Sequence, residues 1–162
     1  MKKTNAMRIL EQKKIPFEAK EYEDDTDHKL ELGAAARTAE KIGMDPKSVF
    51  KTIVMRSDTK EILVFCQNAL SEINLKKARA VSGAKEISSV KPEELMAITG
   101  YIRGGCSPLG MKRQFRTFID QSALENEFIA VSGGQRGIQI KIKPQDLIDA
   151  TQATVCDLIL EK

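Results

Sequence analysis

The stretch T-G-Y-I-R-G-G-C-S-P-L-G-M-K-R, Thr99–Arg113, is the most informative part of this chain. It places four glycines and a proline among polar and basic residues, directly before a predicted strand. A second glycine cluster, V-S-G-G-Q-R-G, follows at Val131–Gly137. Glycine permits positive φ and lets a ligand approach the backbone closely. Two such loops in one small domain indicate a site where backbone N–H groups bind a polar, anionic ligand. The alternative is that both are plain turns.

Length and composition predict one domain spanning residues 1–162. The chain is 41% hydrophobic and 30% charged, as expected for a folded globular protein. Its length allows about two-thirds of the unfolded surface to be buried. The net charge of +3 is a mild basic excess, compatible with nucleic-acid binding but too small to demand it. No segment has the pattern of a signal peptide or of a membrane span, so we expect a cytoplasmic protein with no membrane partner.

Cysteine and histidine usage limits the possible chemistry. The three cysteines, Cys66, Cys106 and Cys156, are widely separated and form no C-x-x-C motif. This spacing argues against a disulfide framework or a zinc ribbon and suits a reducing compartment. The single histidine, His28, lies in the acidic run E-Y-E-D-D-T-D-H and is predicted to be a solvated loop residue. We expect neither a metal nor a cofactor, since sites that need several histidines are excluded by count.

Hydrophobic periodicity and capping residues predict interleaved helices and strands. The predicted helices run from a Thr4 cap to Lys13, then Gly33–Ile42, Asn74–Val81, Glu93–Ile98 and Pro144–Ala150. The predicted strands are Phe17–Tyr22, Val49–Met55, Glu61–Cys66, Arg116–Asp120, Phe128–Val131 and Ile138–Ile142, with Thr154–Leu160 as a last strand or extended tail. Hairpins outnumber crossovers, so we expect an α/β protein of the α+β kind, with a mixed, mostly antiparallel sheet and surrounding helices.

Lys51 is the strongest single candidate for chemistry. Strand alternation puts it on one face with Val49 and Ile53, and puts Phe50 and Thr52 on the other. A lysine on an apolar face must reach water, pair with a carboxylate or enter a pocket. In a pocket it can hold a phosphate or carbonyl oxygen, or act as a base when desolvated. The alternative is an edge-strand lysine with its ammonium in solvent.

Other reactive side chains lack partners in the sequence. Cys106, Ser107 and Ser132 resemble nucleophiles, but no base lies near them, so we expect a bystander thiol and hydrogen-bonding hydroxyls. Several basic residues could instead contact phosphates if their faces coincide. These are Lys76, Lys77, Arg79, Lys112, Arg113, Arg116 and Arg136.

Five motifs in order resemble the YbaK/EbsC-type Cys-tRNA(Pro) deacylases, relatives of the editing domain inserted in bacterial prolyl-tRNA synthetases. They are K-T-N-A-M-R at Lys3–Arg8, V-F-K-T at Val49–Thr52, L-K-K-A at Leu75–Ala78, T-G-Y-x-x-G-G-x-S-P-L-G at Thr99–Gly110 and V-S-G-G-x-R-G at Val131–Gly137. The resemblance covers nearly the whole chain. It implies a mixed sheet curled into a partial barrel, with helices around it.

The resemblance also implies an activity. Such an enzyme acts in trans, removing cysteine that prolyl-tRNA synthetase has attached to tRNA(Pro), and possible further substrates include Cys-tRNA(Cys). A second, hydrolytic check is needed because shape separates similar amino acids by only ~1–3 kcal/mol per methylene. The family is thought to let the substrate thiol attack its own ester, which releases a cyclic thiolactone. The implied partners are the 3′ end of an aminoacylated tRNA and prolyl-tRNA synthetase in a ternary complex.

Site residues follow from the resemblance position by position. Lys51 matches the lysine on which family activity depends, and would hold the 3′-terminal nucleotide or the ester. The other matching residues line the substrate pocket: Tyr22, Phe50, Thr52, Gly104, Gly105, Ser132, Gly133, Arg136 and Gln139. Some family members carry an aspartate where Gln139 stands. Two alternatives remain open, namely a deacylase of the same fold for another small amino acid such as alanine, and a non-catalytic tRNA- or nucleotide-binding module.

Overall fold

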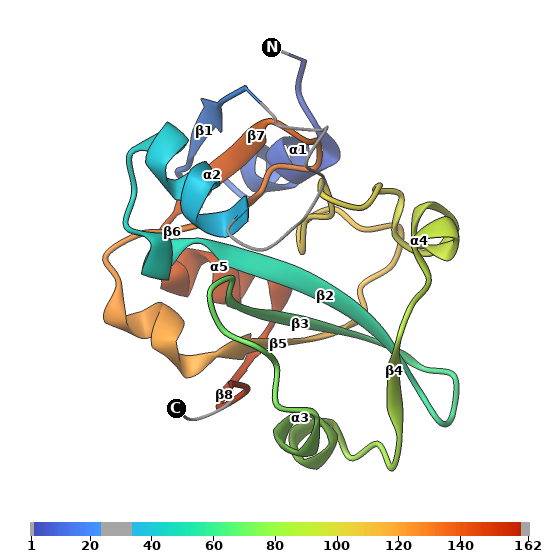
Figure 1. Ribbon diagram of the computed structural model, residues 1–162. Coiled ribbons are helices and arrows are strands. Elements are labelled where there is room, and N and C mark those ends of the chain that lie inside the picture. The colour runs from blue at the N-terminus through green and yellow to red at the C-terminus, as the bar shows by residue number, and fades with distance from the viewer. Residues whose placement is uncertain (1, 24–33, 160–162) are drawn as a thin grey trace.

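The computed structural model describes residues 2–23 and 34–159 (Figure 1). His28 and the acidic residues beside it lie outside the described residues. The helices are α1 (Asn5–Gln12), α2 (Ala34–Ile42), α3 (Leu75–Ser82), α4 (Pro92–Thr99) and α5 (Pro144–Thr151), with 3-10 turns η2 (Pro46–Ser48) and η3 (Gln121–Glu125). The strands are β1 (Glu18–Glu21), β2 (Phe50–Ser57), β3 (Ile62–Asn68), β4 (Ile87–Ser89), β5 (Arg116–Asp120), β6 (Ile129–Ser132), β7 (Ile138–Ile142) and β8 (Thr154–Cys156).

Local sequence signals set the helix ends. The Thr4 hydroxyl accepts a hydrogen bond from the Met7 amide at 3.2 Å and so caps α1. The Asn74 side chain caps α3 in the same way, and Gly83 ends it with a φ of +79°. Prolines occupy the first turns of α4 and α5, where the missing N–H removes no helical bond. The predicted helices are therefore confirmed, with ends shifted by one or two residues.

The strands form two sheets and not the single sheet predicted. The larger has the order β4-β2-β3-β5-β8 and the smaller the order β1-β7-β6. Among the described residues, β3–β5 and β5–β8 pair in parallel and the four other pairings are antiparallel. The mixed, mostly antiparallel character is confirmed, as are both hairpins. The described strands close no barrel, so the partial barrel stays a prediction.

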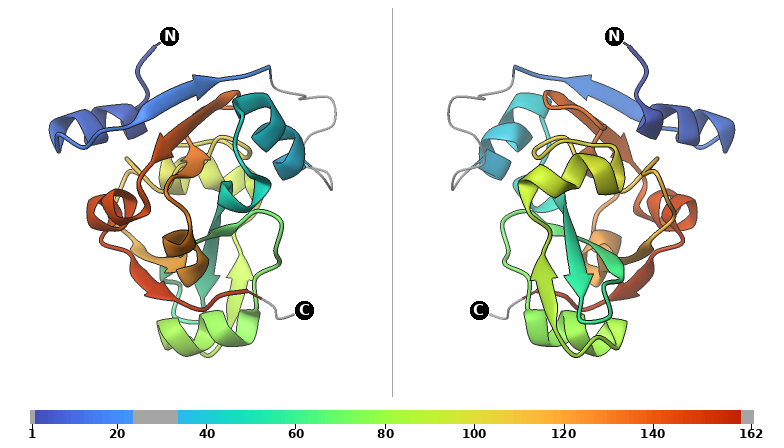
Figure 2. Two further views of the ribbon diagram at one scale, coloured as in Figure 1. Left: turned by 90° about the vertical axis from the view of Figure 1, so that its left-hand side faces the viewer. Right: turned by 90° about the vertical axis from the view of Figure 1, so that its right-hand side faces the viewer.

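The main core lies between the two sheets. Phe50, Val64 and Ile119 of the larger sheet pack with Val131 and Ile140 of the smaller one. Helices α1 and α5 complete this core, and α3 covers the opposite face of the larger sheet. Figure 2 shows α1 and β1 at one end of the molecule and α3 at the other. Both sheets are thus held face to face by apolar side chains, with one bridge, Val49↔Ala130, joining their strands.

Three short elements, η2, β4 and η3, were missed and one was overextended. β4 has only three residues and pairs with β2 at Met55–Ser57. Its sequence has no alternating hydrophobic pattern that would predict a strand. The 3-10 turn η3 was also missed, whereas β8 ends at Cys156, well before the predicted Leu160. No helix in the described part of the chain is long and apolar enough to cross a membrane.

Candidate active site

The two sheets meet along two open strand edges. Val49 and Ala130 form a parallel bridge, so β2 and β6 leave it side by side in the same direction. Among the described residues, no strand pairs with this edge of β2 before β4 joins it at Met55. We call the region between Phe50–Ile53 and Val131–Ser132 the seam. Peptide groups on unpaired edges are available to a ligand, because they lack the hydrogen bonds of a sheet interior.

A line of polar side chains crosses the seam on one face. Residues paired across neighbouring strands share a face, and so do residues two positions further along each strand. Lys51 pairs with Gln67, Ser132 pairs with Gln139, and Gln139 pairs with Lys20. The bridge between β2 and β6 puts Lys51 level with Ser132. These five residues, one from each of β3, β2, β6, β7 and β1, form what we call the polar row.

Lys51 is half-buried within the polar row. Burial lowers the pKa of its ammonium below 10.5, and the carboxylate of Glu72 partly offsets this. In the described part of the chain, the Lys51 side chain makes no hydrogen bond or ion pair. A poorly hydrated ammonium with no protein partner attracts an oxygen of a bound ligand strongly. The structure thus places Lys51 where a carbonyl or phosphate oxygen at the seam would meet it.

Gln139 presents a second polar group to this face. Its side chain is only 8% exposed, and its Oε1 atom has no hydrogen-bond partner among the described residues. Buried acceptors are nearly always paired, so an orphan one indicates a missing donor. Ser132 beside it accepts a hydrogen bond from the Gly134 amide at 3.3 Å. A ligand that carries hydroxyl, amine or thiol donors would satisfy Gln139.

Phe50 and Thr52 point away from the polar row. Phe50 is 2% exposed and packs in the main core, so only its backbone can contact a ligand at the seam. The Thr52 hydroxyl lies 3.9 Å from the Cys66 sulfur, on the same side as Phe50. Both residues belong to the predicted site by sequence position, but their side chains pack on the core side of β2, opposite the polar row.

The two glycine clusters come together, as the sequence predicted. A Cβ atom at Gly105 would lie 3.0 Å from the Arg136 amide nitrogen, so this position requires glycine for the close approach. Gly104 has a φ of +87° and packs under the Arg136 side chain, whose Nε donates to the Arg103 carbonyl at 2.9 Å. Cys106 packs on Val54 of β2. The first loop therefore reaches from β2 to the β6–β7 turn.

Part of this first loop offers unpaired amides. In the described chain, the N–H groups of Gly104, Cys106 and Ser107 make no hydrogen bond within the protein, whereas the Gly105 N–H donates to the Ile102 carbonyl at 3.0 Å. Gly133 instead donates to the Ile138 carbonyl at 2.9 Å, which closes the turn. Unpaired loop amides are the groups that stabilise a developing oxyanion.

The cysteines are poorly suited to act as nucleophiles. Cys106 is 8% exposed, and burial raises the pKa of its thiol to about 11, an effect that the Thr99 hydroxyl partly opposes. Burial also raises the pKa of Cys66 to about 12 and that of Cys156 to about 11. All three thiols are protonated at neutral pH. Within the described residues, no cluster of histidine, cysteine and carboxylate side chains could hold a metal ion.

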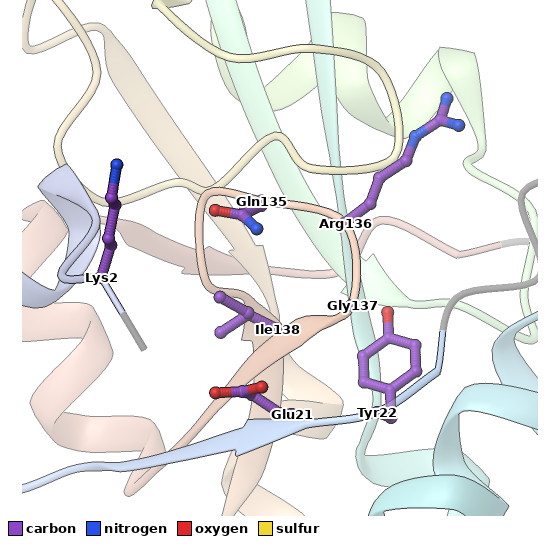
Figure 3. Close-up of a pocket in the computed structure, with 7 residues that line it drawn as sticks. All are labelled: Lys2, Glu21, Tyr22, Gln135, Arg136, Gly137 and Ile138. Carbon is purple, nitrogen blue, oxygen red and sulfur yellow. The ribbon is translucent and has the colours of Figure 1, made fainter.

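A pocket of about 410 Å³ lies at the end of the β6–β7 turn (Figure 3). Figure 3 shows Lys2 and Arg136 on opposite sides of Gln135, with the Tyr22 hydroxyl directed toward Gly137. The Tyr22 amide donates to the Gly137 carbonyl at 2.9 Å and holds β1 against the turn. Two cations and an aromatic ring can contact a phosphate and a nucleobase, although the carboxylate of Glu21 lines the same pocket. The pocket is lined by Lys2, Glu21, Tyr22, Gln135, Arg136, Gly137 and Ile138.

The predicted residues therefore fall in two adjoining places. Lys51, Ser132 and Gln139 lie in the polar row, whereas Tyr22 and Arg136 line the pocket. The β6–β7 hairpin joins the two. Sequence reasoning missed Lys2, Glu21 and Gln135 because nothing local shows that β1 and α1 flank this turn. It also missed Gln67, whose importance depends on its register with Lys51.

Comparison with known proteins identifies the family. Residues 31–150 match the aminoacyl-tRNA editing domain. The chain belongs to this family. An Enterococcus faecalis protein named "Putative Cys-tRNA(Pro)/Cys-tRNA(Cys) deacylase EbsC" is 37% identical over 156 residues, which cover 96% of this chain and 93% of that protein. The predicted resemblance to the YbaK/EbsC-type editing proteins is confirmed.

Other similarities to this editing domain concern the synthetase and the fold. A proline–tRNA ligase of Brachyspira hyodysenteriae is 29% identical over 90 residues, 56% of this chain but only 15% of the ligase. A solved structure described as a "putative trans-editing enzyme for prolyl tRNA synthetase" superposes with a TM-score of 0.85 at 21% identity, covering 99% of this chain and 100% of that one. The editing-domain match includes Lys51 and both glycine loops, and leaves Tyr22 and Lys2 outside it.

Proposed function

We propose that this editing domain is a deacylase that acts in trans on tRNA(Pro) mischarged with cysteine. The observation that carries the proposal is the composition of the seam. Among the described residues, Lys51 has no hydrogen-bond partner on one face of β2, the first glycine loop offers unpaired amides from the other face, and the buried thiol of Cys106 is protonated. Such a site positions and stabilises but does not itself attack. The relative named as a Cys-tRNA(Pro)/Cys-tRNA(Cys) deacylase supports the substrate class.

The substrate thiol would supply the missing nucleophile. The cysteinyl sulfur attacks the carbonyl carbon of its own ester, so a C–S bond forms. The C–O bond to the ribose then breaks, and the thiol proton ends on the ribose oxygen. The products are a cyclic thiolactone and deacylated tRNA. Unpaired amides of the first glycine loop stabilise the negative charge that develops on the carbonyl oxygen, while Lys51 holds the ester in place.

The pocket would receive the terminal nucleotides of the tRNA. Lys2 and Arg136 are cations that bind phosphate, and the Tyr22 ring offers a stacking surface for an unpaired base. Few cations are involved and the whole chain carries only +3, so tRNA binding should be weak and salt-sensitive. Selection of tRNA(Pro) would then come from prolyl-tRNA synthetase in a ternary complex.

The test is release of labelled amino acid from matched substrates. Cys-tRNA(Pro), Ser-tRNA(Pro) and Ala-tRNA(Pro) are incubated with the protein, with and without prolyl-tRNA synthetase. Serine differs from cysteine mainly by its oxygen, which is a poorer nucleophile than sulfur. We expect rapid loss of cysteine only, with the thiolactone detected by mass spectrometry, and loss of activity in Lys51→Ala.

Two other outcomes would replace the proposal. Equal release of alanine and cysteine would retain a deacylase but exclude the thiol mechanism. Binding of tRNA with no release of any amino acid, even with the synthetase present, would indicate a tRNA-binding module.

A further inference from the structure

Gln67 is a fully buried polar side chain with half of its carboxamide unused. The side chain is 0% exposed, on β3 at the centre of the larger sheet. Its Nε2 donates to the Ser71 carbonyl at 2.8 Å. Its Oε1 is buried and has no hydrogen-bond partner among the described residues. This hydrogen bond to Ser71 fixes the orientation of the carboxamide, so the oxygen is held in one direction without a donor.

The strand register pairs Gln67 with Lys51. Gln67 and Lys51 are directly paired across β3 and β2, so their side chains leave the sheet on the same face. The neighbouring pair, Thr52 and Cys66, makes a side-chain contact on the opposite face, which agrees with this register. Lys51 likewise has no hydrogen-bond partner in the described chain. A buried acceptor and a half-buried donor, both unpaired, are therefore neighbours.

We propose that Gln67 is a positioning residue whose carboxamide oxygen accepts a hydrogen bond from the Lys51 ammonium and directs it across the seam toward the substrate. The inference rests on the proposed function only for what Lys51 does next. The proposed contact joins two side chains of this chain and does not depend on the substrate.

A neutral acceptor suits this task better than a carboxylate. An ion pair would neutralise the lysine, whereas a carboxamide stabilises the ammonium and leaves its charge available to a ligand oxygen. The charged group that acts on Lys51 is Glu72, in the β3–α3 connection. Ser132 and Gln139, its neighbours in the polar row, are uncharged, and Lys20 lies at the far end of the row. Gln67 therefore sets the local environment of the ammonium together with Glu72.

The test compares three variants with the wild-type protein. Gln67→Leu removes the oxygen at similar size, and Gln67→Glu replaces it with a carboxylate. Gln114→Leu is the matched control, since Gln114 Nε2 also donates to a backbone carbonyl, that of Thr151 at 2.7 Å, but outside the polar row. The first measurement is the pKa of Lys51, from its rate of acetylation by acetic anhydride across pH, followed by peptide mass spectrometry. It needs no tRNA, so it stands whether or not the protein is a deacylase.

We expect Gln67→Leu to lower the pKa of Lys51 and Gln67→Glu to raise it, with Gln114→Leu unchanged. Removal of the acceptor should also lower kcat on Cys-tRNA(Pro) about tenfold at unchanged KM, because the substrate still binds but the Lys51 ammonium is misdirected. Identical Lys51 titration in the wild type and in whichever Gln67 variants fold would overturn the inference. So would a loss of activity in Gln67→Leu that Gln114→Leu reproduces, since that would be a structural effect.

Discussion

The two faces of β2 carry different kinds of residue only one position apart. On one face Phe50 and Val54 are buried in apolar clusters, and Cys106 of the first glycine loop belongs to the cluster of Val54. On the other face Lys51 is half-buried, next to buried polar oxygens and without a partner. The first face supplies stability and the second leaves an unsatisfied charge. A strand separates the two requirements simply, because successive side chains point in opposite directions.

Replacement of Lys51 should give the largest effect on activity and little effect on folding. We expect Lys51→Ala to reduce deacylation of Cys-tRNA(Pro) on the order of 10²–10³-fold, the usual loss for one electrostatic contact to the reacting group. Because the folded state lowers the pKa of Lys51 below 10.5, the unfolded chain binds this proton more tightly. Wild-type stability should therefore rise as the pH increases through the folded pKa, and the variant should lack this rise.

Urea denaturation of both proteins at pH 7 and pH 10 measures the difference. A variant that is active but unstable would reverse the comparison between the two faces.

Replacement of Phe50 should have the opposite profile. Phe50→Ala leaves a cavity in the main core and should reduce the free energy of unfolding by about 3–5 kcal/mol. Turnover per folded molecule should fall much less than in Lys51→Ala, because the ring does not face the seam. Phe128→Ala, at a half-buried aromatic position, is the matched control with a smaller expected loss. Equal destabilisation by both changes would show that Phe50 has no special place in the core.

A methyl group at Gly105 should disturb the contact between the glycine loops. Gly105 has no positive φ, so Gly105→Ala tests only the 3.0 Å approach to the Arg136 amide. We expect a loss of roughly 1–3 kcal/mol in stability together with reduced turnover, as the loops separate. Gly43→Ala is the control for backbone conformation, since its φ is +72° and no atom lies within 4 Å. Reduced turnover in Gly43→Ala as well would indicate a general effect of stability.

Replacement of Cys106 should have the smallest effect. Burial raises the pKa of its thiol to about 11, so little thiolate exists at neutral pH. We expect Cys106→Ala to retain turnover within about twofold, as for a structural thiol. The assay is release of cysteine from Cys-tRNA(Pro) under single-turnover conditions. If the variant released no cysteine but still bound tRNA, the nucleophile would belong to the protein and the substrate-thiol mechanism would be wrong.

Much of the local structure could be predicted from the sequence. The hairpin from β2 to β3 and the caps of α1 and α3 depend on nearby residues, and all three were confirmed. The division into two sheets could not be predicted, because it depends on the parallel pairing of β3 with β5 across about fifty residues. β4 was missed for the same reason, since only its docking against β2 makes it a strand.

The site was predicted in part by the same logic. Lys51 is visible in the sequence because a lysine is out of place in an apolar strand. Gln67 is inconspicuous there, and it gains meaning only when the register places it beside Lys51. The pocket is lined by Lys2 ahead of α1, by residues at the end of β1 and by the β6–β7 turn, so no single motif contains it. In each case, the pairing between distant segments could not be predicted from the sequence.

The seam also bears on how this protein avoids self-association. Open strand edges normally invite strands from other molecules to add, which leads to aggregation. Here the open edges of β2 and β6 adjoin the same narrow region, and the first glycine loop reaches from one sheet to the other beside them. A strand from another molecule would therefore have to compete with the neighbouring edge for the same space. The unpaired peptide groups can therefore serve chemistry without making the molecule prone to polymerise.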